Sequence, residues 1–152
     1  GVERRFQVLG EPGGIVVVDD YAHHPTEVEV TLAAARERYP DRRLVAVFQP
    51  HLYSRTRDQW RAFGRTLAAA DAVWVTDVFP AREDPIEGVT GELVASAARQ
   101  AGTQVRYHAR IEGIEDALLE WLEPGDVCLL MGAGDIDEHA HALANLLAEE
   151  GS

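Results

Sequence analysis

Two hydrophobic patterns alternate along the chain from one end to the other. Short apolar runs bounded by glycine, proline or acidic residues are typical of strands, and apolar residues three and four apart are typical of helices. We predict strands at 4–9, 15–18, 44–48, 72–76, 105–108 and 127–131. We predict helices from residue 25 to the Pro40-Asp41 stop, and at 58–70, 90–99, 111–121 and 136–147.

This alternation predicts an α/β fold. Strands separated by helices of ten or more residues form a parallel sheet through right-handed crossovers. The first connection, at 11–14, is short enough only for an antiparallel pair. The run at 127–131 is apolar throughout, as a strand covered on both faces is. We expect one domain over residues 1–152, with a six-stranded, mostly parallel sheet, an antiparallel first strand and about five helices.

Charge and composition narrow the classes of function. The formal net charge of −12 argues against a nucleic-acid partner, because phosphate binding needs a clustered positive surface. All 14 basic residues are arginine, so the chain has no P-loop lysine and no lysine base. The single cysteine, Cys128, suits a reducing cytoplasm, and no apolar run approaches the ~20 residues of a membrane helix. We expect a cytoplasmic protein with no membrane contact.

The residues after the second predicted strand are rich in polar groups. Residues 19–27 read DDYAHHPTE and lead directly into a helix amino terminus, which attracts anions through free N–H groups and its dipole. At a strand end that we expect to be exposed, Asp20 can accept hydrogen bonds from a sugar diol. His23 can donate one to a phosphate or a carboxylate. The alternative is that Asp19 or Asp20 ties down the turn and His24 caps the helix.

Two further loops follow predicted strands. Arg55 is expected in the loop after the third strand and Arg57 at the start of the next helix. Arginine suits bidentate contact with an anion, but Asp58 can satisfy Arg57, so Arg55 is the favoured anion-binding residue. After the last strand, the glycines of the GAGD loop at 132–135 allow close approach of a ligand to the backbone. The residue at 137 is an aspartate, so the loop is not a dinucleotide fingerprint.

Three strings resemble a known family. DDYAHHPTE at 19–27, FQPHLYSRTRD at 48–58 and MGAGDI at 131–136 resemble the carboxy-terminal domain of the Mur ligases, in particular of members that add L-alanine to UDP-N-acetylmuramate. The opening GVERRFQVLGE and the segment FPAREDPIEGVTGELVA extend the resemblance over nearly the whole chain. The DD-aromatic-AHHPT string also occurs in the related ligase that recycles murein tripeptide, whereas Tyr21 and HLYSRTRD favour the alanine-adding members.

The resemblance implies a Rossmann-like three-layer domain of a larger enzyme. In that family an amino-terminal domain binds the UDP-sugar, and a central domain carries the P-loop, Mg²⁺ and most of the ATP site. The chain resembles the third domain only and begins at Gly1 in strand-like sequence, so we expect it to be a fragment without activity of its own. The implied reaction is activation of a carboxylate by ATP to an acyl phosphate, followed by attack of the L-alanine amino group.

The resemblance also implies roles for individual residues. Arg5 matches an arginine that reaches the nucleotide phosphates, and Asp20 matches an aspartate associated with the ribose. The remaining matches line the muramate–alanine end of the site. These substrate-binding positions are Tyr21, His23, Arg55, Gly132, Ala133, Gly134 and Asp135. Leu52 stands where some relatives have arginine, which leaves more of the anionic contact to Arg55.

Three hypotheses remain open from the sequence. The first is a ligase fragment that works with UDP-N-acetylmuramate, L-alanine, ATP and Mg²⁺, together with its own two missing domains. The second is a stand-alone module that binds a nucleotide or an acidic metabolite. The third is a metallohydrolase using His23, Asp20 and His51. We expect no metal site, because no spacing matches a zinc pattern and the pairs His23–His24 and His139–His141 are expected to point apart.

Overall fold

The computed structural model describes residues 5–150 and confirms the predicted fold class. Within that range the chain forms six strands and five α-helices, with a short 3₁₀ turn (η2) at Pro12–Gly14. The strands are β1 (Gln7–Gly10), β2 (Val16–Asp20), β3 (Leu44–Phe48), β4 (Ala72–Val75), β5 (Gln104–Tyr107) and β6 (Val127–Met131). The helices are α1 (Pro25–Arg38), α2 (Tyr53–Leu67), α3 (Gly91–Gln100), α4 (Ile114–Trp121) and α5 (Ile136–Glu150).

The sheet has the strand order β1-β2-β6-β3-β4-β5. β1 pairs antiparallel with β2, as the short connection predicts, and the other pairs are parallel. β6, the last strand in the chain, lies between β2 and β3 at the centre of the sheet. All five of its residues are buried, which agrees with its apolar sequence.

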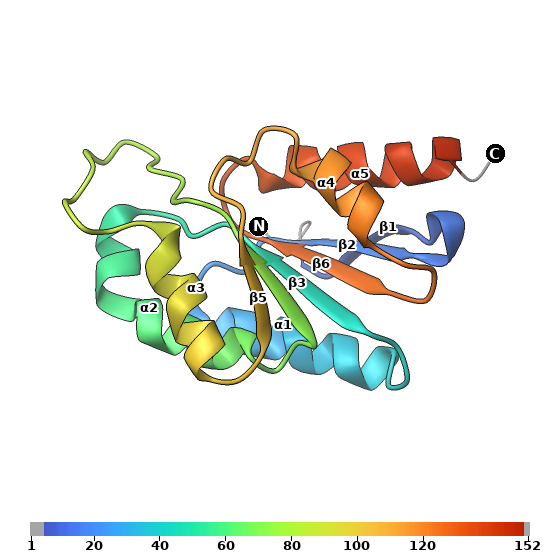
Figure 1. Ribbon diagram of the computed structural model, residues 1–152, viewed down its shortest axis with the longest axis horizontal. Coiled ribbons are helices and arrows are strands. Elements are labelled where there is room, and N and C mark those ends of the chain that lie inside the picture. The colour runs from blue at the N-terminus through green and yellow to red at the C-terminus, as the bar shows by residue number, and fades with distance from the viewer. Residues whose placement is uncertain (1–4, 151–152) are drawn as a thin grey trace.

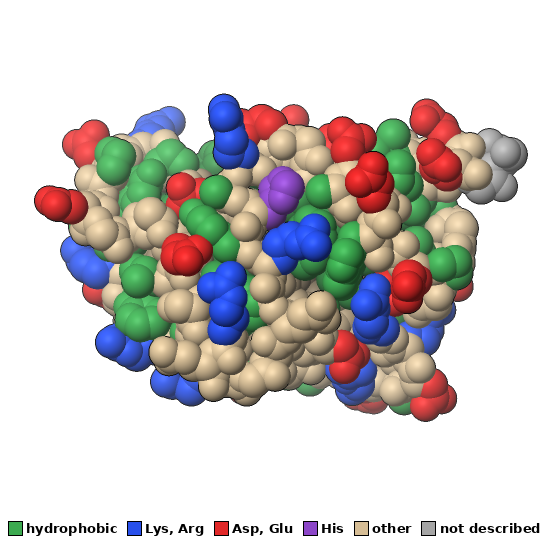
Figure 2. Space-filling model, in the orientation of Figure 1, with side chains coloured by type: hydrophobic (Ala, Val, Ile, Leu, Met, Phe, Trp, Pro, Cys, Tyr) green, Lys and Arg blue, Asp and Glu red, His purple; other side chains and the backbone are tan. Residues whose placement is uncertain are grey.

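Helices cover both faces of the sheet, so the domain has three layers. In Figure 1, α1, α2 and α3 lie below the sheet, and α4 and α5 lie above it. One apolar cluster packs Val28, Leu32 and Phe63 of the lower helices against the sheet, and a second packs Ile114 and Leu143 of the upper ones. None of the described helices is long and apolar enough to cross a membrane. Figure 2 shows acidic and basic side chains interspersed on the face that it displays.

The ends of several strands and helices differ from the predicted ones. β3 and β6 have the predicted ends, but β2 continues two residues further, to Asp20. β1 begins at Gln7 rather than at residue 4, which lies outside the described residues. The largest error concerns α2, which begins at Tyr53, five residues before the predicted start at 58. Arg55 therefore lies in the first turn of a helix and not in a loop.

The register of the central strands brings three loops together. Asp20 of β2 pairs with Met131 of β6, and Met131 pairs in turn with Phe48 of β3. The three strands thus end in one row, and the residues after them emerge side by side at the carboxyl edge of the sheet. In open α/β sheets this edge is where ligands bind.

Candidate functional site

Backbone hydrogen bonds continue past the last strand residues and join the three loops. The N–H of Gly132 donates to the carbonyl of Asp20 at 3.1 Å, and the N–H of Gln49 donates to the carbonyl of Met131 at 3.0 Å. Across the junction the ring centroids of His23 and His51 lie 6.1 Å apart. The structure therefore brings together the three polar segments that the sequence placed at strand ends.

Asp20 is buried, which contradicts the expectation of an exposed strand end. The residue is 1% exposed. One carboxylate oxygen accepts the N–H of Phe6 at 2.7 Å, and the other accepts the N–H of Ala22 at 2.8 Å. β2 continues through Asp20, and the backbone of Phe6 and of Ala22 contacts its carboxylate. In this structure Asp20 fastens the segment before β1 to the turn after β2, as the alternative interpretation proposed.

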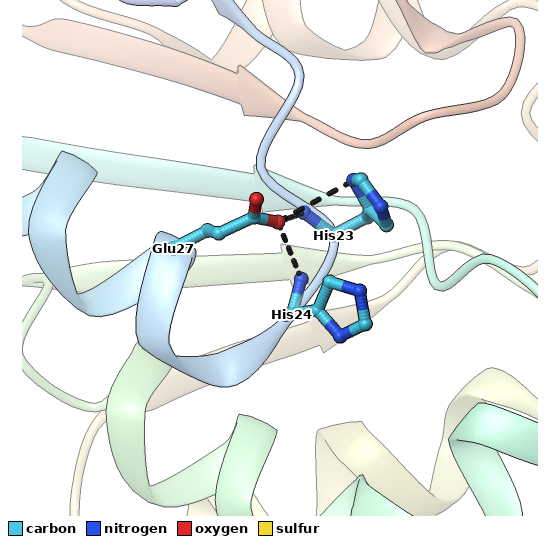
Figure 3. A group of neighbouring side chains, drawn as sticks. All are labelled: His23, His24 and Glu27. Carbon is cyan, nitrogen blue, oxygen red and sulfur yellow. Dashed lines mark hydrogen bonds and ion pairs between the residues drawn. The ribbon is translucent and has the colours of Figure 1, made fainter.

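The turn at the start of α1 is organised by Glu27. One of its carboxylate oxygens accepts the N–H groups of His23 at 3.0 Å and of His24 at 3.1 Å, as Figure 3 shows. The other oxygen lies 3.3 Å from a guanidinium nitrogen of Arg5. Burial alone would raise the pKa of Glu27, but the backbone N–H of His23 and the neighbouring imidazoles lower it overall. Glu27 thus links Arg5, expected at the nucleotide, to His23, expected at the substrate, and to the neighbouring His24.

The two adjacent histidines do not diverge, contrary to the sequence-based expectation. Their ring centroids lie 4.6 Å apart, because His24 takes an extended conformation at the helix start. His23, His24 and Glu27 offer ligand atoms within 4.8 Å of one another. However, Nδ1 of His23, which lies 3.4 Å from Glu27, is also 2.8 Å from the carbonyl of Tyr21. Two imidazoles and one carboxylate do not fit Mg²⁺, which prefers oxygen ligands.

Arg55 and His51 form a second cluster. A guanidinium nitrogen of Arg55 donates to the carbonyl of His51 at 3.2 Å and lies 3.4 Å from its Nδ1. Burial, together with the positive charge of Arg55, lowers the pKa of both His51 and His24. Arg55 therefore lies beside the imidazoles of His51 and His24, which are mainly neutral at neutral pH. Arg57 is exposed and pairs with Asp58 at 2.9 Å, as the sequence predicted.

The loop at 132–135 is packed against the protein itself. Gln49 donates from its amide nitrogen to Asp135 at 2.8 Å, and its amide oxygen accepts the N–H of Ile136 at 3.3 Å. A Cβ on Gly134 would lie 2.5 Å from the ring of Phe79, and one on Gly132 would lie 3.0 Å from the carbonyl of Gln49. The glycines permit this close internal packing, and the partly buried Ala133 lies between them.

Sequence reasoning assigned no role to three residues of this region. Gln49 is 3% exposed and ties the end of β3 to the start of α5. Phe79 and Glu83 come from the loop between β4 and α3, where Phe79 contacts His51 after β3 and Glu83 contacts Ser54 in the first turn of α2. Gln49 could have been noticed because it directly follows a buried strand. The segment containing Phe79 and Glu83 contributed to the family resemblance, but its polar residues follow no periodicity that indicates their contacts.

The strand order, the mixed sheet and the three joined loops define an α/β domain with a candidate binding site at the carboxyl edge of its sheet, and comparison with known proteins identifies its family. The chain matches the family model described as "Mur ligase, glutamate ligase domain" over residues 4–134. The chain therefore belongs to the Mur ligase family.

Individual relatives show which ligases of this family the chain resembles. The chain is 51% identical to a UDP-N-acetylmuramate–L-alanine ligase of Salinibacter ruber over 99% of its length, and it spans 32% of that protein. The crystal structure of a UDP-N-acetylmuramate–alanine ligase from Thermotoga maritima is similar over 99% of this chain and 31% of that one, with 26% identity and a TM-score of 0.81. A murein peptide ligase from Psychrobacter arcticus shares the fold over 96% of this chain and 30% of that one, with 24% identity and a TM-score of 0.75.

Proposed function

We propose that this chain is the carboxy-terminal domain of an ATP-dependent UDP-N-acetylmuramate–L-alanine ligase. The observation that carries the proposal is the 51% identity to the Salinibacter ligase over 99% of the chain, which spans all three loops of the candidate site. The chain covers about a third of that protein. We therefore propose that residues 1–152 form one domain, and that the UDP-binding and ATPase domains belong to sequence outside it.

The proposed reaction forms an amide bond in two steps. ATP transfers its γ-phosphoryl group to the carboxylate of UDP-N-acetylmuramate, which gives an acyl phosphate and ADP. The amino group of L-alanine then attacks the acyl carbon, and inorganic phosphate leaves. Such chemistry depends mainly on positioning and on stabilising negative charge. Because the substrates are nucleotides and free amino acids, we propose a cytoplasmic location.

In our proposal this domain supplies the muramate–alanine end of the active site, which we call the acceptor site. Arg55 binds an anionic group at the sheet edge, and Tyr21, His23 and the loop 132–135 line the space beside it. The proposal is supported by the position of the half-buried Arg55 beside the strand ends and by the lowered pKa values of His51 and His24, which leave the guanidinium of Arg55 as the positive charge beside these imidazoles. Tyr21 packs edge-on against His23, with ring centroids 4.9 Å apart, and this contact orients both side chains.

The nucleotide side involves Arg5 and Asp20. Arg5 is paired with Glu27 through groups that are 41% and 27% exposed, and an exposed pair of this kind is weak enough to exchange for a phosphate. Asp20 accepts the N–H of Phe6, the residue after Arg5, and we propose that it assists nucleotide binding by fixing the backbone beside Arg5. Mg²⁺ does not fit the described cluster of His23, His24 and Glu27, so we assign it to the central domain.

Steady-state kinetics on the full-length enzyme test the function. We expect phosphate release that requires ATP, UDP-N-acetylmuramate and L-alanine together. Activity with murein tripeptide in place of L-alanine would instead support the ligase that recycles this tripeptide. The isolated chain should bind its ligands weakly and release no phosphate, because it has no lysine and no P-loop. Alanine-dependent phosphate release by the isolated chain would reject the assignment to a ligase fragment.

A further inference from the structure

The first turn of α2 has no capping residue of its own. Its N-cap, Leu52, has no side-chain acceptor and has a positive backbone φ (φ 75°, ψ 130°), which is uncommon outside glycine. The first turn contains no acid and carries Arg55. The free N–H groups and the dipole at a helix start favour negative charge, so the local sequence holds this turn poorly.

Glu83 provides the missing cap from 29 residues further along the chain. One of its carboxylate oxygens accepts the N–H of Ser54 at 3.0 Å, and the other accepts the hydroxyl of Ser54. These bonds, first that from the hydroxyl and then that from the N–H, lower the pKa of Glu83, and the nearby charge of Arg55 acts in the same direction. The carboxylate is therefore ionised at neutral pH and lies where the helix dipole favours a negative charge.

The loop that carries Glu83 is itself fixed against the same site. In Figure 1 it is the long yellow-green segment between β4 and α3, which reaches the start of α2 beyond the strand ends. Phe79 donates its N–H to the carbonyl of Pro50 at 2.8 Å and accepts the N–H of Leu52 at 2.9 Å. Its ring stacks on that of His51, with centroids 5.6 Å apart and an interplanar angle of 11°.

Backbone strain marks both ends of this contact. Leu52 has φ 75°, and Ala81, in the turn closed by the N–H of Glu83 on the carbonyl of Pro80, has φ 56°. Neither is a glycine, and such conformations persist only where surrounding contacts impose them. The buried Thr56 adds a further contact by donating its hydroxyl to the carbonyl of Leu52 at 2.9 Å.

We propose that Glu83 is a positioning residue for the acceptor site of the ligase reaction. By capping α2 it fixes the first turn, and with it the place from which Arg55 reaches the sheet edge. The carboxylate does not touch the substrate in this arrangement, and it acts through Ser54 and the helix start. This inference rests on the proposed function of the Arg55 cluster and adds a residue from a fourth loop to it.

The test compares three variants of the full-length ligase. Glu83→Ala removes the cap, Glu83→Gln keeps an oxygen acceptor but not the charge, and Glu87→Ala removes an exposed acid from the same loop as a matched control. We expect Glu83→Ala to lower kcat/KM for L-alanine about five- to tenfold, mainly through KM, as the loss of a helix cap suggests. The KM values for ATP and UDP-N-acetylmuramate should stay within about twofold, and Glu83→Gln should recover part of the loss.

Hydrogen exchange of the amides at 53–56 provides an independent measurement. In Glu83→Ala these amides should exchange faster than in wild type, while the Glu87→Ala protein should be unchanged. Faster exchange with unaltered alanine kinetics would overturn the positioning role, and unaltered exchange would overturn the capping role. If the wild-type enzyme does not use L-alanine at all, the proposed function fails, and the exchange measurement still decides whether Glu83 organises this helix start.

Discussion

Individual polar residues at the sheet edge serve the fold as much as the site. The sequence predicted which residues lie at this edge, because polar residues between a buried parallel strand and the following helix lie at the carboxyl end of the strand. It did not predict their burial. Asp20 and Gln49 are 1% and 3% exposed, and each uses both of its acceptor or donor atoms on neighbouring loops. Apart from Ala22, which lies two residues after Asp20, those partners are 14 to 87 residues away in the chain, so no local pattern indicates them.

Replacing Asp20 should destabilise the domain, contrary to what its predicted exposure suggested. In Asp20→Ala the N–H groups of Phe6 and Ala22 lose their acceptor, and a buried unsatisfied donor costs about 1–3 kcal/mol. Urea unfolding of the chain should show a loss of that order or larger. Asp41→Ala, which removes an exposed acid, should stay within about 0.5 kcal/mol of wild type. Equal midpoints for the two variants would contradict the structural role of Asp20.

At the scale of elements, the boundaries that local sequence sets were predicted, and the boundary that a distant residue sets was not. β3 and β6 were predicted to the residue because their sequences are apolar throughout and the residues that flank them favour turns. Thr90 was correctly predicted to cap α3, where its hydroxyl accepts the N–H of Glu92 at 3.2 Å. The start of α2 was missed because its cap, Glu83, lies in a different loop. A boundary imposed by a distant residue leaves no signal at the boundary itself.

The two arginines at the start of α2 should differ in function. Arg55 turns back to the carbonyl of His51 at the sheet edge, whereas Arg57 is exposed and paired with Asp58. A lost charge-assisted hydrogen bond corresponds to roughly ten- to a hundredfold in catalytic efficiency. We expect Arg55→Ala to reduce kcat/KM of the full-length enzyme at least tenfold and Arg57→Ala clearly less, in kinetics with each substrate varied in turn. A larger loss for Arg57→Ala would show that the wrong arginine was assigned to the anion.

The contact between α2 and α3 should make a normally favourable substitution harmful. Glycine to alanine within a helix usually stabilises by up to about 1 kcal/mol. At Gly64, however, a Cβ would lie 2.2 Å from the Cβ of Ala97 and 2.7 Å from the backbone nitrogen of Ala98. Gly64→Ala should therefore lower the free energy of unfolding by about 1–3 kcal/mol, because the helices must separate. Arg65→Ala, on an exposed position of the same helix, is the control, and a stabilised Gly64→Ala protein would refute this packing argument.

At the scale of the whole molecule, the layers follow from the sequence but the strand order does not. Alternating strands and long helices predict a parallel sheet with both faces covered, and the two apolar clusters show that arrangement. The insertion of β6 between β2 and β3 depends on pairing across more than 80 residues, for which the chain offers only the apolar character of 127–131. That insertion makes three loops from distant parts of the chain neighbours, so the site is a consequence of the topology.

The stability of the molecule should fall as the solution is acidified below neutrality. Burial lowers the pKa of His24, His51 and His108, and the charges of Arg55 or Arg106 lower it further. In the unfolded chain these imidazoles titrate near 6.5, so below that pH the unfolded state binds more protons than the folded state. The free energy of unfolding must then decrease as the pH falls through about 6.5, and the loss should be complete once the pH is below the folded-state pKa values.

Urea unfolding at several pH values between 7.5 and 5.0 measures this dependence directly. The lowered pKa values of Glu27, Glu83 and Asp58 contribute stability above their unfolded values, near 4, which is lost only below that range, so they do not obscure the histidine window. His51→Gln removes one titrating group beside Arg55 and should flatten the slope, whereas His141→Gln, at an exposed position of α5, should leave it unchanged. A wild-type stability that is constant or rises on acidification through this window would show that the folded protein does not hold these imidazoles neutral.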